Sequence, residues 1–290
     1  MNSPYVITGP AQIAFSGGRT SGFMLHKILE ANGGLPPDVH VSFQNTGKER
    51  EETLEFIHEC ETRWDVKVNW LEWVGRGAEN SFRRPAWQFV NFKTADRVGT
   101  PFASLIREKG YLPNVKHRIC TANLKILVGE AFMRSMGYAE WDSAMGIRAD
   151  EPKRVARMLA PGRDTTAGDP LLPLYRANIS KPEILAWWKS QPFDLQLDPD
   201  LDLGNCDLCF LKGRAKNVAA LRSEPERAVW WIQQEKHVGS TFIKGYVSYD
   251  DLVREASFRN SQIEIFALDQ AIADGYDPDD ERIADCMCGD

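Results

Sequence analysis

The first regular pattern in the chain is Gln12-Ile13-Ala14-Phe15-Ser16-Gly17-Gly18-Arg19-Thr20-Ser21. Its apolar start predicts a short strand, and its paired glycines predict a tight turn. The apolar side chains that come next recur at helical spacing, and they are Phe23, Met24, Leu25, Ile28 and Leu29. We therefore expect the fold to begin with a strand, a glycine turn and a helix.

The alternation of strands and helices is expected to continue toward the C-terminus. Residues 39–43 and 66–73 alternate apolar and polar side chains, which predicts two further strands. Helical spacing predicts helices over 51–64 and 123–136, and a strand is expected over 141–146. Strands that alternate with helices form parallel sheets covered on both faces. The sequence therefore predicts an α/β fold with a doubly wound, mostly parallel sheet.

The chain is expected to divide into three parts. Residues 1–205 form the α/β domain, in which Ser180 and Glu183 are spaced as a capping box that opens a helix. Residues 206–273 form a helical C-terminal region, because the spacing of apolar residues is helical from Arg214 onward. Residues 274–290 are acidic and contain Gly and Pro, which predicts a mobile tail.

Composition narrows the class of protein. The chain has 290 residues, 43% of them hydrophobic, which is too apolar for general disorder. It carries 35 Lys and Arg against 41 Asp and Glu, and the resulting charge of −6 argues against a histone-like polyanion binder. No stretch approaches the roughly 18 unbroken apolar residues of a membrane span, and no basic region followed by an apolar run suggests secretion. We expect a cytoplasmic protein without a membrane partner.

The glycine turn has the composition of an anion site. Its glycines allow backbone N–H groups to turn toward a ligand, and the following helix adds its positive end. The hydroxyls of residues 16, 20 and 21 and the guanidinium of Arg19 would complete the cradle. The alternative is a tight strand-to-helix turn without a ligand.

Five segments in order resemble the phosphoadenosine phosphosulfate (PAPS) reductase family of the adenine nucleotide alpha-hydrolase superfamily. The glycine turn is similar to the pyrophosphate-binding (PP) loop of that superfamily, whose usual form is Ser-Gly-Gly-Lys-Asp-Ser. The other four are Asn45-Thr46-Gly47-Lys48-Glu49, Arg118-Ile119-Cys120-Thr121-Ala122-Asn123-Leu124-Lys125, Gly146-Ile147-Arg148-Ala149-Asp150-Glu151 with Arg154, and Cys206-Asp207-Leu208-Cys209 with Lys212-Gly213. Together they cover roughly residues 12–213.

The resemblance implies an adenine nucleotide as substrate or cofactor, held in the α/β domain. The implied nucleotide-binding residues are Ser16, Gly17, Gly18, Arg19, Thr20, Ser21, Asn45, Thr46, Gly47, Lys125, Gly146 and Arg148. Arg148 resembles the family's phosphate-contacting arginine and is a candidate catalytic residue. Arg19, Thr20 and Asn45 replace the usual Lys, Asp and Asp. Because magnesium prefers carboxylate ligands, this loss puts magnesium and ATP cleavage in doubt more than nucleotide binding.

The resemblance also divides the six cysteines. It implies that Cys120, Cys206 and Cys209 bind a 4Fe-4S cluster, with zinc as the alternative metal. The fourth ligand is left open: either absent or supplied by the tail. Cys288 with Gly289 looks like the catalytic Cys-Gly on the tail of family reductases, which would make Cys288 a nucleophile reduced by a thioredoxin-like partner. The family's following His is absent, and acidic neighbours work against a reactive thiol.

A basic stretch lies within this acidic chain. Residues 81–118 hold eight Lys or Arg against Asp96 and Glu108, with aromatic residues interleaved; these are Phe82, Trp87, Phe89 and Phe92. Such a stretch either contacts an anionic substrate, with rings available to stack on nucleic-acid bases, or is a solvated face.

Three functions remain open. The first is a PAPS-reductase-family enzyme, an oxidoreductase or transferase, that binds an adenine nucleotide and carries out sulfur redox or transfer chemistry with an iron–sulfur cluster. The second is ATP-dependent thiolation of a nucleic-acid base, with the polymer held by residues 81–118. The third is a nucleotide-binding regulatory module with structural zinc.

Overall fold

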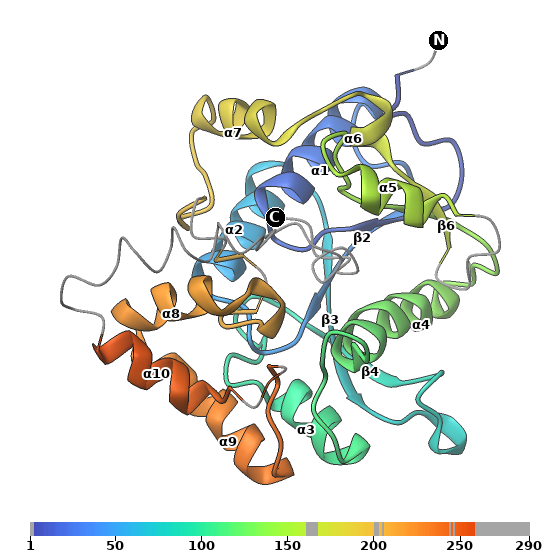
Figure 1. The fold of residues 1–290 in the computed structure, drawn as a ribbon. Coiled ribbons are helices and arrows are strands. Elements are labelled where there is room, and N and C mark those ends of the chain that lie inside the picture. The colour runs from blue at the N-terminus through green and yellow to red at the C-terminus, as the bar shows by residue number, and fades with distance from the viewer. Residues whose placement is uncertain are drawn as a thin grey trace.

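One mixed sheet organises the computed structural model, which describes residues 3–160, 168–199, 203–204, 206–243, 245 and 247–258. The strand order is β4-β3-β2-β1-β5-β6 (Figure 1). The strands are β1 (Ala11–Ala14), β2 (Val39–Asn45), β3 (Val68–Gly75), β4 (Ala86–Val90), β5 (Asp142–Ala144) and β6 (Asp169–Leu171). All neighbouring pairs are parallel except β3 and β4. The predicted α/β, mostly parallel sheet is confirmed.

Helices connect the strands, and further helices come after the last strand in the chain. They are α1 (Arg19–Asn32), α2 (Glu51–Arg63), α3 (Thr100–Lys109), α4 (Leu127–Ser135), α5 (Pro152–Met158), α6 (Pro173–Arg176), α7 (Lys181–Lys189), α8 (Arg214–Ser223), α9 (Ala228–Val238) and α10 (Tyr249–Phe258). Short 3₁₀ turns occupy Ala78–Asn80, Phe210–Lys212 and Pro225–Arg227, and a π-helix occupies Cys120–Ile126. The expected capping box is present at the start of α7.

Two large hydrophobic cores lie on opposite faces of the sheet. Successive residues of a strand point to opposite faces, so Trp70 of β3 joins one core while Leu71 and Trp73 join the other. The first core is formed with α1, α2 and α7, and the second with α3, α4 and the helices α8–α10. The helical region after Cys206 therefore shares a core with the sheet.

Two parts of the chain differ from the prediction. The helix expected over 123–136 starts earlier, as the π-helix, and becomes α-helical only at α4. Within residues 81–118, where no elements were predicted, lie the antiparallel edge strand β4 and the helix α3. The side chain of Asp96 organises the turn before α3, since its Oδ1 accepts hydrogen bonds from the backbone N–H groups of residues 98, 99 and 100.

None of the helices in the part of the chain that the structure describes has the length and apolar character to cross a membrane. The tail expected at 274–290 lies outside the described residues.

Candidate functional site

The carboxyl ends of β1 and β5 meet at the point where the strand order reverses. The chain moves from β1 to β2 on one side of the sheet, whereas β5 pairs with the other side of β1. Ligands of doubly wound folds bind in the crevice outside such a switch point. The loops that follow the two strands touch here, because a Cβ added at Gly146 would lie 3.4 Å from Thr20 Cγ2 and 3.5 Å from Ser21 Cα. The structure thus brings together two of the segments predicted to bind a nucleotide.

The loop of residues 16–21 is a tight turn that leads into α1. Gly17 has φ +81°, a conformation that favours glycine, and Gly18 is the N-cap of α1 without a side-chain cap bond. The Ser16 and Ser21 hydroxyl oxygens are 3.1 Å apart, and Ser21 Oγ donates to the Gly18 carbonyl at 3.0 Å. These bonds fix the turn so that the positive end of α1 faces the crevice, which suits an anion.

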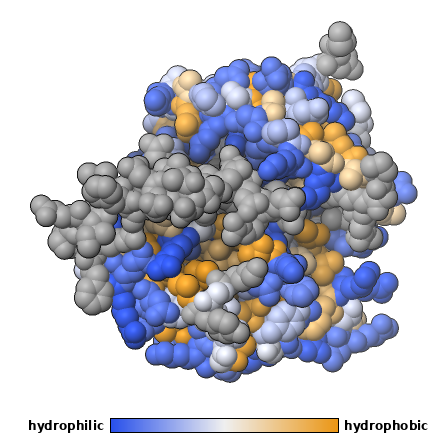
Figure 2. Space-filling view, viewed as in Figure 1, coloured by the Kyte–Doolittle hydropathy of each residue, from blue (hydrophilic) through white to orange (hydrophobic). Residues whose placement is uncertain are grey.

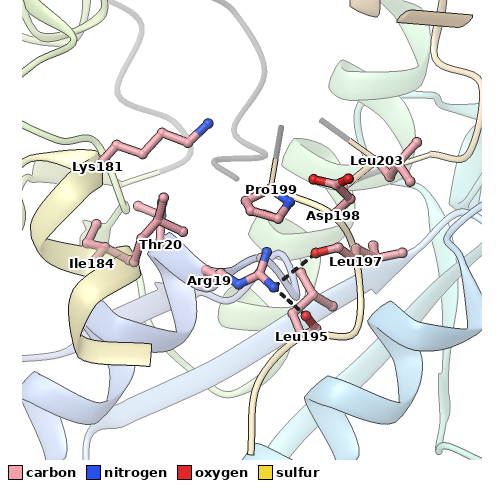
Figure 3. A pocket seen from close by; sticks show the side chains of 12 residues that line it. Arg19, Thr20, Lys181, Ile184, Leu195, Leu197, Asp198, Pro199 and Leu203 are labelled. Atoms are coloured by element: carbon pink, nitrogen blue, oxygen red, sulfur yellow. Dashed lines mark hydrogen bonds between the residues drawn. The ribbon is translucent and has the colours of Figure 1, made fainter. Parts of the chain in front are cut away.

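Arg19 has a structural partner that the sequence did not indicate. Its Nε donates to the Asp194 carboxylate at 2.8 and 3.0 Å, and its Nη2 donates to the carbonyl oxygens of Leu195 and, at 3.0 Å, Leu197. The guanidinium therefore fastens residues 194–197 to the start of α1. A pocket with about 440 Å³ of empty space, part of it open to solvent, lies beside this contact. Figure 3 shows Arg19 directed toward Leu195 and Leu197, between the walls of the pocket.

Replacing Arg19 by lysine, the usual residue at this position in the resembled loop, is expected to destabilise the protein by about 1–3 kcal/mol. An ammonium group cannot reproduce the planar set of bonds to Asp194 and two carbonyls. Urea denaturation measures the loss, and proteolysis should become faster near residues 194–199. Arg254→Lys is the control, because its partner Asp250 forms an exposed pair. Equal stability of both variants would contradict this role of Arg19.

Arg148 lies beside the loop, at the start of the segment after β5. Its Nη1 donates to Thr20 Oγ1 at 3.4 Å, and its Nε pairs with Asp150 at 2.9 Å. The Arg148 backbone N–H donates to Glu151 at 2.9 Å. These contacts hold the guanidinium next to the start of α1, where it can meet the negative charge of a bound phosphate or sulfate.

Asn45 and Gly47 shape the turn after β2. The fully buried Asn45 amide donates to Glu72 Oε1 at 2.6 Å and to the Asp96 carbonyl at 2.8 Å, while its Oδ1 accepts from Gly47 N at 3.2 Å. Gly47 has φ +78°, and a Cβ there would come within 2.1 Å of Asp96 Oδ1. The amide at position 45 is thus bonded within the protein, and the glycine permits the close approach of residues 96–99.

The turn after β2 contacts the first cysteine of the CxxC segment. Glu49 and Cys206 form an isolated antiparallel bridge, and Thr46 Oγ1 lies 3.5 Å from Cys206 Sγ. Thr46 also donates from its backbone N–H and its hydroxyl to the Glu49 carboxylate at 2.9 Å. Lys125 Nζ lies 3.9 Å from that carboxylate. Burial, and then the charge of Glu49, raise the pKa of the Cys206 thiol well above its usual value.

The three predicted metal ligands lie in or against the second core. Cys206, Cys120 and Cys209 all belong to or pack against the second core, and the pKa of Cys206 is also raised by the nearby Cys209. Among the described residues, no three His, Cys, Asp or Glu side chains form a group arranged for a metal ion. The chemistry of three cysteine sulfurs fits a thiolate-bound iron–sulfur cluster or zinc. Cys288 and Gly289 lie outside the described residues.

A buried charge network holds the CxxC segment, and the sequence did not predict it. Asp207, only 3% exposed, pairs with Lys48 Nζ at 3.1 Å and accepts from Trp231 Nε1 at 2.9 Å. Lys212 Nζ donates to the Cys206 carbonyl at 2.8 Å. The position of an acidic residue between the two cysteines was the one feature of the sequence that could have directed attention to Asp207.

A protein of a bacterial virus is similar to most of this chain. No family model matches the chain. The uncharacterized nin region protein ORF290 of Escherichia phage lambda is 33% identical to it over 216 residues, which is 73% of this chain and 69% of that protein.

Proposed function

The chain belongs to the family of the nin region protein ORF290 of phage lambda, and for this member we propose an enzyme that binds an adenine nucleotide and carries out sulfur redox or transfer chemistry. One observation carries the proposal: the nucleotide-type loop meets the segment of Arg148 at the switch point, and the turn after the neighbouring strand β2 touches Cys206. The proposed anion site and the Cys206 thiol would therefore lie at adjacent strand ends. This is the arrangement that sulfur transfer from or to a nucleotide would need.

In the proposed enzyme, the nucleotide phosphates lie on residues 16–21. The turn and the start of α1 supply backbone N–H donors, and Arg148 orients the anionic group that reacts. Lys125, 3.9 Å from Glu49, places positive charge on the side of the site that holds Cys206. The nucleophile proposed for a reductase, Cys288, which a thioredoxin-like partner would reduce, lies outside the described residues.

Cys120, Cys206 and Cys209 would hold the proposed 4Fe-4S cluster. When bound, the cluster would supply electron transfer or a binding point for sulfur. The surrounding residues support a cysteine-bound metal in two ways: Thr46 offers a hydroxyl to Cys206, and the Asp207 network orients the peptide between the two cysteines. Because such thiolates need reducing surroundings, we place the enzyme in the cytoplasm.

Anaerobically purified protein is expected to contain iron and acid-labile sulfide. Cys206→Ala, Cys209→Ala and Cys120→Ala should each lose most of the iron, because each removes a thiolate ligand. Cys60→Ala is the matched control, since Cys60 is fully buried in the first core among apolar side chains. Iron and sulfide analysis decides the result. Zinc without sulfide would instead favour a regulatory module with a structural metal, and iron retained in all three variants would remove the ligand assignment.

The activity is tested by a substrate screen. We expect the purified protein to bind a sulfonucleotide or ATP, and the reacting member of that set identifies the chemistry. No binding of any adenine nucleotide would end the proposal.

A second candidate is ATP-dependent thiolation of a nucleic-acid base. It is favoured by the exposed cations on the loop between β3 and β4, where Arg83 and Arg84 are both solvent-exposed. The replacement of two carboxylates in the resembled loop segments weighs against ATP cleavage, which places this candidate second.

A further inference from the structure

Two parts of the basic stretch 81–118 have different surroundings in the fold. In one part, Arg97 pairs with Glu51 at 2.7 Å and lies over the ring of Phe92. Phe92 in turn stacks on His58 and packs against the first core. These charges and rings are occupied by the protein itself, so this part stabilises α2 and the sheet.

The other part surrounds Phe82 on the connection between β3 and β4. Lys109 Nζ lies 3.3 Å from the centre of the Phe82 ring, and the guanidinium of Arg76 lies 4.4 Å from it. Arg76 also pairs with Glu108 of α3 at 3.0 Å, which ties the connection to the end of that helix. Arg83 and Arg84 follow Phe82 directly and are exposed. Two cations thus contact the Phe82 ring, and two exposed cations follow it in the chain.

Positive charge is in excess at this surface. The connection between β3 and β4 and the last two residues of α3 carry four cations, Arg76, Arg83, Arg84 and Lys109, against the two carboxylates of Glu79 and Glu108. The pKa of Lys109 is lowered, first by its partial burial and then by the neighbouring charge of Arg76, while Glu108 acts in the opposite direction. Cations that repel one another on an acidic protein favour an anionic partner. The connection protrudes beside α3 in Figure 1, and that corner of the molecule is largely hydrophilic in Figure 2.

An exposed aromatic ring lies on the adjoining edge strand. Phe89 of β4 is 57% exposed, although its ring contacts Trp87 and Phe132 at centroid distances of 5.1 and 6.0 Å. These contacts hold the ring in place while much of it faces solvent. Phe89 is thus a fixed, exposed ring on the strand that follows Arg83 and Arg84 in the chain, and such a ring can stack on an unpaired base.

We propose that Arg76, Phe82, Arg83, Arg84, Phe89 and Lys109, here called the hairpin surface, bind single-stranded nucleic acid. The cations contact the phosphates, and Phe89 stacks on a base. An acidic peptide would satisfy the charges but would leave Phe89 without a stacking partner, so nucleic acid fits both features. The proposal does not depend on the function of the nucleotide site.

The test measures binding of fluorescent 12-nucleotide RNA and DNA strands by anisotropy over a salt series. Arg83→Glu combined with Arg84→Glu should weaken binding about tenfold or more and flatten the slope of log K against log salt by about 1.4, since each lost phosphate contact accounts for about 0.7. Phe89→Ala should weaken binding about tenfold with an unchanged salt slope. The matched control is Lys67→Glu with Lys189→Glu, which makes the same charge change at two other exposed positions.

Several outcomes would overturn the proposal. The first two are absence of binding at low salt and an equal loss of affinity in the control variant. The other two are tighter binding of duplex DNA than of either single strand, and equally tight binding of a polyglutamate peptide. RNA and DNA are compared side by side because a contact to the 2′-hydroxyl would separate them. Melting temperatures exclude unfolding of the variants, and adenine-nucleotide affinity measured in the same variants keeps this result separate from the function of the nucleotide site.

Discussion

Gly17→Val is expected to weaken adenine-nucleotide binding by about 100-fold or more, because a misplaced turn loses at least two charge-assisted hydrogen bonds worth about 1.5–3 kcal/mol each. A Cβ at this position would come within 2.6 Å of Thr53 Cγ2 and 2.8 Å of Ile57 Cδ1, both on α2. The turn of residues 16–21 must therefore move away from α2, and the N–H groups at the start of α1 lose their alignment. Isothermal titration with ATP or a sulfonucleotide measures the affinity.

Gly33→Val is the matched control for this prediction. Gly33 also has positive φ, +67°, but a Cβ there would meet nothing within 4 Å. Both variants lose stability because a side chain is strained at positive φ, by about 1–3 kcal/mol. Only Gly17→Val is expected to lose affinity. A Gly17→Val protein that is folded and binds adenine nucleotide as tightly as the wild type would contradict the proposed phosphate-binding role of the turn.

Asp207→Ala is expected to lower the free energy of unfolding by about 3–5 kcal/mol, because it leaves a buried cation without its partner. Lys48, 8% exposed, would lose the carboxylate 3.1 Å from its Nζ, and Trp231 Nε1 would lose its acceptor at 2.9 Å. Because Asp207 lies between the two cysteines proposed as metal ligands, the content of the proposed metal should fall as well. Guanidinium denaturation and metal analysis measure the two effects.

Two comparisons make the Asp207 experiment specific. Glu30→Ala breaks the exposed Lys27–Glu30 pair, and it should lower the free energy of unfolding by less than about 1 kcal/mol. Asp207→Asn keeps an oxygen that can accept from Trp231 but removes the charge. Its loss of unfolding free energy should therefore fall between the losses of Asp207→Ala and Glu30→Ala. A stability of Asp207→Ala close to that of Glu30→Ala would show that the buried network contributes little.

Local sequence patterns predicted the elements around the nucleotide-type loop. The expected strands at 39–43 and 66–73 correspond to β2 and β3, and the expected helix at 51–64 corresponds to α2. Periodicity succeeds here because each element buries one face or both against the same sheet, so its apolar spacing is visible within a short window. The capping box at Ser180 is equally local, because its two side chains are three residues apart.

Apolar spacing was a weaker predictor of secondary structure in residues 81–118. The strand β4 pairs on one side only and is nowhere fully buried, so its side chains show little apolar alternation. The start of α3 depends on Asp96, whose carboxylate caps three successive backbone N–H groups before the helix. A cap of this kind becomes visible only when the turn is folded.

The sequence by itself determined the class of fold, the position of the glycine turn, and the residue types available for anion and metal chemistry. Only the tertiary structure decided what those residues contact. Arg19 binds Asp194, which is 175 positions away, and Glu49 pairs with Cys206 across a similar interval. It also decided which cations of the basic stretch are neutralised, since Arg97 reaches Glu51 while Arg83 and Arg84 remain exposed. The physical reason is the separation along the chain over which each effect acts. Backbone preference and apolar spacing act between near neighbours in the sequence. Ion pairs and buried hydrogen bonds form only between groups that the packing of the whole chain brings within a few ångströms.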